Sequence, residues 1–224
     1  MTMTAPEETA NAPQTPAASA PATRVPASRA AQPVLEKLFE LYPHLFGAEF
    51  WPLKLGIFQE LLALHPNEFE RASLKLALGV HTRSTRYLQC VAAGKPRHDL
   101  QGVAVGPVAP EHVYLSVVEL YRRRQARTQE DLRPKLRRQL AAALEASNLS
   151  NADYLALVQT HDAQADDALQ AVLQDVLEDR ASRLAKQAAL LQAFDASGKT
   201  AEEFADMYGL AVAEVAKMLA SRDI

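Results

Sequence analysis

Apolar residues recur at helical spacing through most of this 224-residue chain, and prolines and glycines divide the pattern into segments. Pro33 is expected to start the first helix, because proline suits the first turn, where its missing N–H is not needed. The stripe that follows comprises Val34, Leu35, Leu38, Phe39, Leu41 and Tyr42. Pro43 predicts the end or a kink of this helix, because the proline ring clashes with the preceding turn.

A second helix is expected to follow Pro52 and to begin with Lys54, with an apolar stripe of Leu55, Phe58, Leu61 and Leu62. Pro66 interrupts the pattern. The third helix is expected to be capped by Asn67, with Glu70 as the reciprocal partner of that cap. Its predicted buried side contains Leu74, Ala77 and Leu78.

A fourth helix spans roughly residues 82–92, and Gly94 predicts its end. The next segment, residues 97–106, has two short pieces of alternating character around Gln101-Gly102, which is typical of a β-hairpin. Pro110 and Glu111 then open a fifth helix. This helix ends in a run of arginines at positions 122, 123, 124 and 127.

From Leu132 onward the pattern predicts helices alone. Ser150 with Asp153 resembles a capping pair, and a long amphipathic helix is expected from about residue 163 to 194, with Gly198 as its stop. The predicted fold class is therefore mainly α: a helical domain that carries a short β-hairpin, followed by an all-helical C-terminal extension.

The composition of the first 33 residues differs from that of the rest, with six prolines and ten alanines. Such a segment buries too little apolar surface to offset its chain entropy, so residues 1–33 are predicted to be a disordered tail. The folded units are predicted to be residues 34–127 and residues 128–224.

A lone cysteine, Cys90, excludes an intrachain disulfide framework. The start of the chain has no pattern of a secretory signal, and no apolar run approaches the length of a membrane span. A cytoplasmic location is expected.

The net charge of −3 conceals an uneven distribution. Residues 34–127 hold 12 Lys and Arg against 9 Asp and Glu, whereas residues 145–224 hold 6 against 14. A basic first half beside an acidic second half indicates an anionic partner for the first half.

Candidate chemistry concentrates at residues 82–87. Arg83 and Arg86 are three apart, and Tyr87 is four residues after Arg83, so one helical face is expected to present all three. Guanidinium groups bind phosphate in bidentate geometry, and tyrosine stacks on a base or bonds a phosphate. Thr82 and Ser84 are expected at the helix N-terminus, which favours an anion. The alternative interpretation is a solvated face with a buried tyrosine.

Four further cations are expected to line the same concave surface: Lys54, Lys75, Lys95 and Arg97. Singly, each is an ordinary solubilising side chain. Together, on consecutive short elements, they predict a nucleic-acid interface.

Three motifs of the chain resemble those of the ProQ/FinO-domain family of bacterial RNA chaperones, in the same order. Residues 51–61 are similar to its Pro-Leu-Lys-Ile-Gly-Ile-Phe-Gln signature, and residues 81–88 to Tyr-Thr-x-Ser-x-Arg-Tyr-Leu. Residues 97–102 resemble its Arg-x-Asp-Leu-x-Gly element. Gly79 and His81 depart from the family, since relatives often carry arginine and tyrosine there, and Arg83 is expected to restore the charge.

The resemblance implies post-transcriptional regulation by binding of small regulatory RNAs and mRNA 3′ ends, at terminator-like stem-loops with a single-stranded 3′ tail. By position it implies RNA contacts for Lys54, Lys75, Arg86, Tyr87 and Arg97, and a 3′-end pocket near Thr82, Ser84 and Asp99. The full predicted RNA-binding set is Lys54, Lys75, His81, Thr82, Arg83, Ser84, Arg86, Tyr87, Lys95, Arg97 and Asp99.

Two other functions compete with RNA binding. Residues 201–220 have the spacing of a helix-turn-helix with a turn at Gly209, which suggests a DNA-binding regulator, although the acidic residues there argue against it. A helical protein-interaction module is the other alternative. No motif of an enzyme is present, and the run His161, Asp162, Asp166, Asp167 is explained by the dipole of the helix it precedes better than by a metal site. No enzymatic activity, cofactor or metal is expected.

Overall fold

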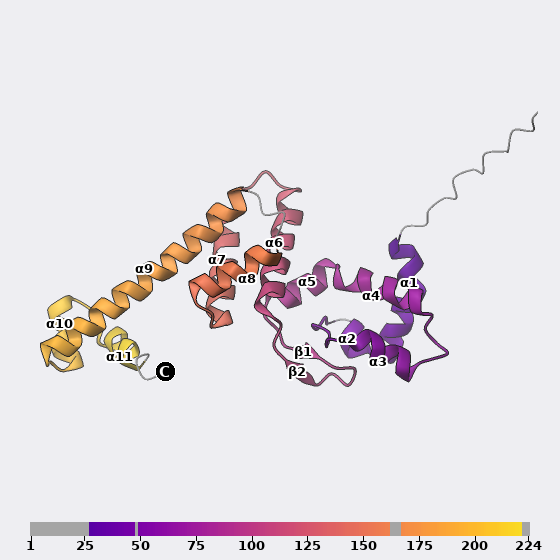
Figure 1. Cartoon of the computed structure of the whole chain (residues 1–224), viewed down its shortest axis with the longest axis horizontal. Helices are drawn as coiled ribbons and strands as arrows, with labels where there is room; N and C mark the ends of the chain where they lie inside the picture. The colour runs from indigo at the N-terminus through magenta and orange to yellow at the C-terminus, as the bar shows by residue number, and fades with distance from the viewer. Residues whose placement is uncertain (1–26, 48, 162–166, 221–224) are drawn as a thin grey trace, which may run out of the picture.

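The computed structural model describes residues 27–220, except residue 48 and residues 162–166. The described chain is mainly helical and carries one two-stranded antiparallel sheet (Figure 1). The elements are, in order, α1 (Ala27–Leu41), α2 (Pro43–Phe46), α3 (Ile57–Leu64), α4 (Arg71–Thr82), α5 (Thr85–Ala92), β1 (Arg97–His98), β2 (Ala104–Gly106), α6 (Pro110–Gln125), α7 (Arg133–Ser147), α8 (Asn151–His161), α9 (Asp167–Ser197), α10 (Ala201–Tyr208) and α11 (Val212–Ala220). The predicted fold class, including the hairpin and the helical C-terminal extension, is confirmed.

The first core lies among α1–α5 and the hairpin. Its members come from every one of these helices, with Leu38, Leu45, Leu61 and Leu74 completely buried. Because α1 packs along α4, helices that are far apart in the sequence close over one apolar centre.

Helix α1 begins earlier than the sequence predicts. It starts at Ala27 and Pro33 lies inside it, although proline removes one helical hydrogen bond. Ala31 is completely buried, so the turn before the proline packs against the rest of the domain, and tertiary packing stabilises most helices more than local propensity does. Residues 1–26 of the predicted tail lie outside the described residues.

The predicted starts of the next two helices are also wrong. Gly56 has a left-handed φ of 85°, so the chain turns there and α3 begins at Ile57, which leaves Leu55 72% exposed and Lys54 ahead of the helix. At α4 the cap is Glu70 rather than Asn67. The Glu70 carboxylate accepts the backbone N–H groups of Ala72 (3.2 Å) and Ser73 (2.9 Å).

The predicted fourth helix is shorter because α4 runs on through Thr82. The chain breaks at Arg83 and Ser84, and the Ser84 hydroxyl accepts the Tyr87 N–H at 3.2 Å as the cap of α5. Gly94, with a φ of 67°, follows the end of α5 as predicted.

The hairpin is confirmed and is organised by Asp99. One carboxylate oxygen, Oδ1, accepts the N–H groups of Gln101 (3.0 Å) and Val103 (2.9 Å) across the turn. Gly102 has a φ of 79°, and a Cβ there would lie 2.8 Å from the His44 ring, so the turn requires glycine. The strands pair Arg97 with Gly106 and His98 with Ala104.

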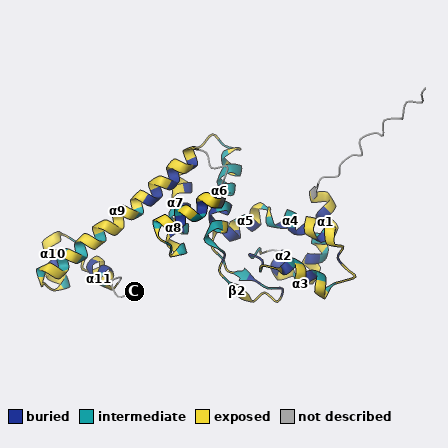
Figure 2. Cartoon of the chain, viewed as in Figure 1, coloured by how far each residue is buried: buried dark blue, intermediate teal, exposed yellow. Residues whose placement is uncertain are grey.

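A second core joins α6 to the helices that follow it. Tyr114, Val117 and Val118 of α6 are buried against α7, α8 and α9, where Leu140 and Tyr154 are completely buried. Figure 2 shows α6 between the two parts of the molecule, mostly of intermediate exposure, and its buried positions lie in the middle of the helix. A boundary at residue 127 therefore does not coincide with a gap in packing, since the last helix of the predicted first unit supplies the core of the second.

The C-terminal helices confirm several local predictions. Ser150 and Asp153 form the capping pair of α8, at 3.1 Å from the Asp153 N–H to the Ser150 hydroxyl, and Gly198 follows α9 with a φ of 61°. Helices α10 and α11 pack Phe204, Val215 and Met218 against the far end of α9.

Asp162 and Asp166, two of the four residues considered as a metal site, lie outside the described residues. Among the helices that are described, none is long and apolar enough to cross a membrane.

Candidate nucleic-acid interface

Residues 50–54, which we call the aromatic segment, organise the predicted site. The Arg86 guanidinium lies over the Phe50 ring, 5.1 Å from its centre, and the Lys95 ammonium lies 4.3 Å from the centre of the Trp51 ring. Aromatic faces attract cations and hold them in place without neutralising their charge. The segment therefore fixes two positive charges that come from α5 and from the turn before β1.

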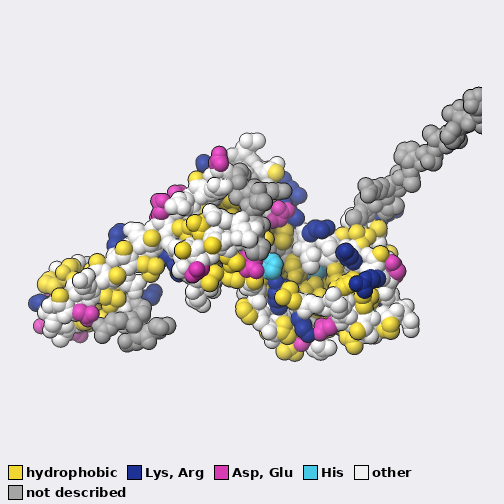
Figure 3. All heavy atoms as spheres, viewed as in Figure 1, with side chains coloured by type: hydrophobic (Ala, Val, Ile, Leu, Met, Phe, Trp, Pro, Cys, Tyr) yellow, Lys and Arg dark blue, Asp and Glu magenta, His cyan; other side chains and the backbone are white. Residues whose placement is uncertain are grey.

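These two cations border a shallow hollow of about 370 Å³, lined also by Glu49, Phe50, Gln89, Cys90 and Ala93, so that one carboxylate faces the two positive charges. Arg86 is exposed and Lys95 is half-buried, so both reach solvent. Figure 3 shows several Lys and Arg side chains spread over the face of the molecule formed by the first helices. The geometry suits an anionic ligand that rests in the hollow between the two charges.

Arg97 and Lys54 adjoin the same segment, and both have partners within the protein. Arg97 donates from Nη1 to the Leu53 carbonyl at 2.9 Å, and its Nη2 lies 3.2 Å from His112 Nδ1. Lys54 pairs with Glu60, which raises the pKa of the lysine, and both side chains are more than one-third exposed. A surface pair of this kind contributes little stability, so Lys54 can exchange Glu60 for a phosphate at little cost.

Tyr87 supports the aromatic segment from beneath and does not face solvent. Its side chain is buried, and its hydroxyl accepts the Leu53 N–H at 3.0 Å. Burial raises the pKa of the phenol. The expectation that Arg83, Arg86 and Tyr87 share one helical face is wrong, because the chain breaks before α5 and the tyrosine points into the core.

His81 is likewise a core residue, which contradicts its predicted exposure to RNA. Its ring stacks on Phe50 at 4.7 Å between centroids and also contacts Phe46 and Tyr87. Burial lowers its pKa to about 4, so the ring is neutral near pH 7. His81 therefore carries no charge toward a phosphate, and it supports the ring on which Arg86 rests.

The three polar residues expected near a 3′-end pocket have structural partners. The Thr82 hydroxyl donates to the Leu78 carbonyl at 2.8 Å at the end of α4, so Thr82 does not lie at a helix N-terminus. Ser84 caps α5 and Asp99 closes the hairpin turn. Ser84 and Thr82 remain partly exposed, close to the break between α4 and α5.

Lys75 on α4 and Arg83 just after its end form a second group of cations. Both side chains are exposed, and their spacing through Gly79 puts all three positions on one face of the helix region. A Cβ built on Gly79 would lie 3.8 Å from Arg83 Nη1, so the Arg83 guanidinium lies close to the space that a side chain at position 79 would use. This placement agrees with the expectation that Arg83 supplies the charge absent at Gly79.

Sequence reasoning missed the role of Phe50 and Trp51 as supports for the cations. Their partners Arg86 and Lys95 are more than thirty-five residues away along the chain, so no local spacing relates them. The available signal was two adjacent aromatic residues before Pro52 in an otherwise aromatic-poor sequence.

The domain is mainly helical with a short hairpin, and several of its cations lie against aromatic rings. These features are those of a candidate nucleic-acid-binding protein. Residues 28–133 match the ProQ/FINO family, and this part of the chain belongs to that family.

The similar curated proteins include the RNA chaperone ProQ of Shewanella pealeana and that of Shewanella halifaxensis. Each is 40% identical over 84 residues, which cover 36% of this chain and 40% of the relative. The match thus spans well under half the length of the curated relatives.

Two solved structures are also similar in sequence. One is a FinO-like RNA chaperone from Neisseria meningitidis MC58, 30% identical, matched over 40% of this chain and 92% of that chain with a TM-score of 0.36. The other is a ProQ homolog from Legionella pneumophila, 26% identical, matched over 55% and 99%, with a TM-score of 0.35.

Proposed function

We propose that this protein is an RNA chaperone of the cytoplasm that binds structured small RNAs and mRNA 3′ ends through residues 28–133. Its preferred RNA is a terminator-like stem-loop with a single-stranded 3′ tail. It acts by binding and does no bond chemistry, protecting the 3′ end and assisting regulation after transcription. The ProQ/FINO match and the similarity to RNA chaperones of other bacteria support this proposal.

The observation that carries the proposal is the placement of cations along the aromatic segment. Arg86, Lys95 and Arg97 contact three different residues of residues 50–54, and Lys54 belongs to the segment itself. An A-form stem exposes phosphates and 2′-hydroxyls and hides its base edges in a deep major groove. A rigid arrangement of charges therefore recognises such a stem by shape.

Tyr87 and His81 are buried, so we propose that they position the RNA-binding residues and do not contact RNA themselves. Tyr87 and His81 hold the aromatic segment against α4 and α5, so their contribution to RNA binding is indirect. Arg86, Lys95, Arg97, Lys54, Arg83 and Lys75 are proposed to contact phosphate, with Thr82, Ser84 and Asp99 near the RNA 3′ end.

Arg86→Ala tests the proposal most directly. We expect RNA affinity to fall by roughly 1–3 kcal/mol, the scale of a lost charged contact at a nucleic-acid interface. Filter binding of a hairpin with a 3′ single-stranded tail, at two salt concentrations, measures both the affinity and its salt dependence.

Lys199→Ala is the matched control, because Lys199 is an exposed cation in the C-terminal extension. An Arg86→Ala protein with the affinity and salt slope of this control would remove Arg86 from the interface. A hairpin that lacks the tail tests the 3′-end preference separately: equal binding of both hairpins would contradict that part of the proposal.

A protein-interaction module is a second candidate, for α10 and α11 alone. Met207, Tyr208 and Val212 are each about half exposed around the turn at Gly209. The same helices carry Glu202, Glu203, Asp206 and Glu214 with one cation, Lys217. A DNA-binding recognition helix is expected to be basic, so this surface favours a protein partner over DNA.

A further inference from the structure

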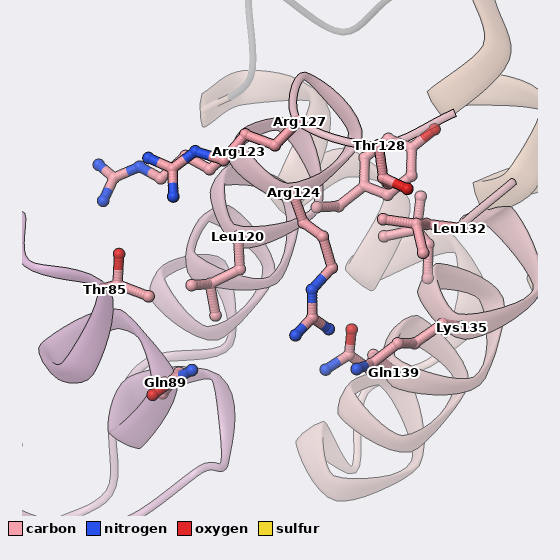
Figure 4. A pocket seen from close by; sticks show the side chains of 12 residues that line it. Thr85, Gln89, Leu120, Arg123, Arg124, Arg127, Thr128, Leu132, Lys135 and Gln139 are labelled. Atoms are coloured by element: carbon pink, nitrogen blue, oxygen red, sulfur yellow. The ribbon is translucent and has the colours of Figure 1, made fainter. Parts of the chain in front are cut away.

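A second basic hollow lies between α5, the end of α6 and α7, and we call it the α5–α7 groove (Figure 4). It has a volume of about 440 Å³, and its cationic lining residues are Arg123, Arg124, Arg127 and Lys135. In the close-up, Arg124 points from α6 into the space beside Lys135 and Gln139, while Thr85 and Gln89 face it from α5. Three helices thus direct polar or positively charged groups into one hollow.

The charges of the groove are largely uncompensated. Arg124, Arg127 and Lys135 are exposed, and no carboxylate within the described ranges pairs with them or lines the groove. Arg123 differs, because it pairs with Glu119 at 2.7 Å and donates to the Arg83 carbonyl at 2.8 Å. Like charges that line one groove without counter-charges repel one another, and an anion in the groove relieves that repulsion.

The groove adjoins the hollow beside Arg86. Gln89 lines both, while the neighbouring residues Thr85 and Arg86 line the groove and the hollow respectively. A duplex carries closely spaced phosphates along its whole length, about one every 1.7 Å in DNA, so a stem that contacts Arg86 presents further phosphates beyond that contact. Arg123 strengthens the connection, since its bond to the Arg83 carbonyl ties the end of α6 to the α4–α5 break.

Residues from two parts of the chain, the family domain and the C-terminal extension, line the groove. Arg123, Arg124 and Arg127 lie within the part that matches the ProQ/FINO family, whereas Lys135 and Gln139 belong to α7, beyond residue 133. The second core holds α7 against α6 through Leu136 and Leu140, which fixes the far wall of the groove. The C-terminal extension therefore supplies part of a surface whose other half is in the family domain.

We propose that the α5–α7 groove binds the phosphate backbone of the RNA stem, at a distance from the end held beside the aromatic segment. This inference rests on the proposed function and extends it. The aromatic segment holds the base of the stem and its tail, and the groove holds phosphates farther along the same stem. The extension thereby increases the length of duplex that the protein prefers.

The test compares two RNA hairpins with the same 3′ tail, one with a short stem and one whose stem is longer by about one helical turn. The variant is Arg124→Ala/Arg127→Ala/Lys135→Ala, and the control is Lys186→Ala/Lys199→Ala/Lys217→Ala, which removes three exposed charges from α9–α11. We expect the variant to lose affinity for the long stem, with a plot of log K against log salt shallower by about 1 for each cation removed. Short-stem binding stays within error of the control.

Because the three residues are exposed, the variant is expected to keep the circular dichroism and melting temperature of the parent. Lys135→Glu is a second, single substitution that leaves α6 untouched, and it is expected to weaken long-stem binding alone. If the triple variant and the control bind the long stem equally, with equal salt slopes, the groove is not a phosphate site. If the unmodified protein binds neither hairpin, the proposed function fails and this inference falls with it.

Discussion

Two pairs of consecutive helices in this molecule, α4 with α5 and α10 with α11, carry surface charges of opposite sign. In the first pair the break at Arg83 and Ser84 is followed by a serine cap, and exposed cations lie on both sides of it. In the second, Gly209 adopts a φ of 64° and the neighbouring charges are acidic. A turn between two helices therefore does not by itself indicate nucleic-acid binding. The sign of the exposed charges beside the turn distinguishes a surface that suits nucleic acid from one that does not.

The two pairs also differ in what supports their surface side chains. Arg86 rests on Phe50, whose ring stacks on His81, which in turn contacts Tyr87. On α10, by contrast, the Tyr208 ring packs on Phe204 and is about half exposed. The first pair holds charges in fixed positions, whereas the second presents apolar surface.

Phe204→Ala separates the two regions and has the largest expected effect. Phe204 is completely buried between α9, α10 and α11, so its truncation is expected to cost about 3–5 kcal/mol of local stability. Hydrogen exchange is expected to show lost protection in α10 and α11 with α4 and α5 unchanged, and RNA affinity is expected to be retained. A parallel loss of RNA binding would show that the two regions act together.

The pH dependence of stability also distinguishes the two helix pairs, because the buried His81 belongs to α4, whereas α10 and α11 contain no histidine. The folded-state pKa of about 4 is below the usual 6.5, so the unfolded chain binds the proton more readily. The contribution of neutral His81 to the free energy of unfolding is therefore fully present above about pH 6.5 and is lost as the pH falls toward 4. The difference between the unfolded and folded pKa values corresponds to about 3 kcal/mol of stability.

Urea denaturation at pH 7 and at pH 4.5 measures this effect, with His81→Phe as the comparison. Phenylalanine suits a position surrounded by Phe46, Phe50 and Tyr87, and it removes a buried Nε2 that has no partner among the described residues. The variant is expected to lose less stability than the parent at the lower pH. Equal losses in the two proteins would assign the pH dependence to other groups.

Local signals in the sequence predict much of the fold. Gly94, Gly198, the Ser150–Asp153 pair and the turn at residues 101–102 all act within a few residues, and each ends or begins an element where expected. The first residues of α1, α3 and α5 could not be predicted from such local signals. There the start depends on the packing of Ala31, on the left-handed Gly56, and on a serine cap inside an otherwise continuous helical pattern.

The candidate site was predictable in its residues but not in their roles. The cations at 54, 86, 95 and 97 lie along the aromatic segment. Three of them fall within the motifs that carry the family resemblance, and Lys95 lies two residues before the third motif. Burial of Tyr87 and His81 depends on contacts with Leu53 and Phe50, far away in the sequence. Residue type alone does not distinguish a supporting ring from one that contacts a ligand.

The smallest expected effect tests whether the aromatic support matters to binding. Trp51→Leu keeps the Lys95 charge but removes the ring 4.3 Å from its ammonium. A cation–π contact at an exposed site contributes about 0.5–1 kcal/mol, so RNA affinity is expected to fall by that amount at most.

Because Trp51 also contacts the His98 ring at 4.5 Å, the substitution alone mixes binding with local packing. The double-mutant cycle with Lys95→Ala isolates the pair, since any general loosening appears equally with and without the lysine. We expect a coupling of about 0.5 kcal/mol in RNA binding for this pair, and none between Trp51→Leu and Lys75→Ala, because Lys75 is an exposed cation of α4. Additive losses at Trp51 and Lys95 would mean that the ring holds the backbone of the segment but does not position the charge.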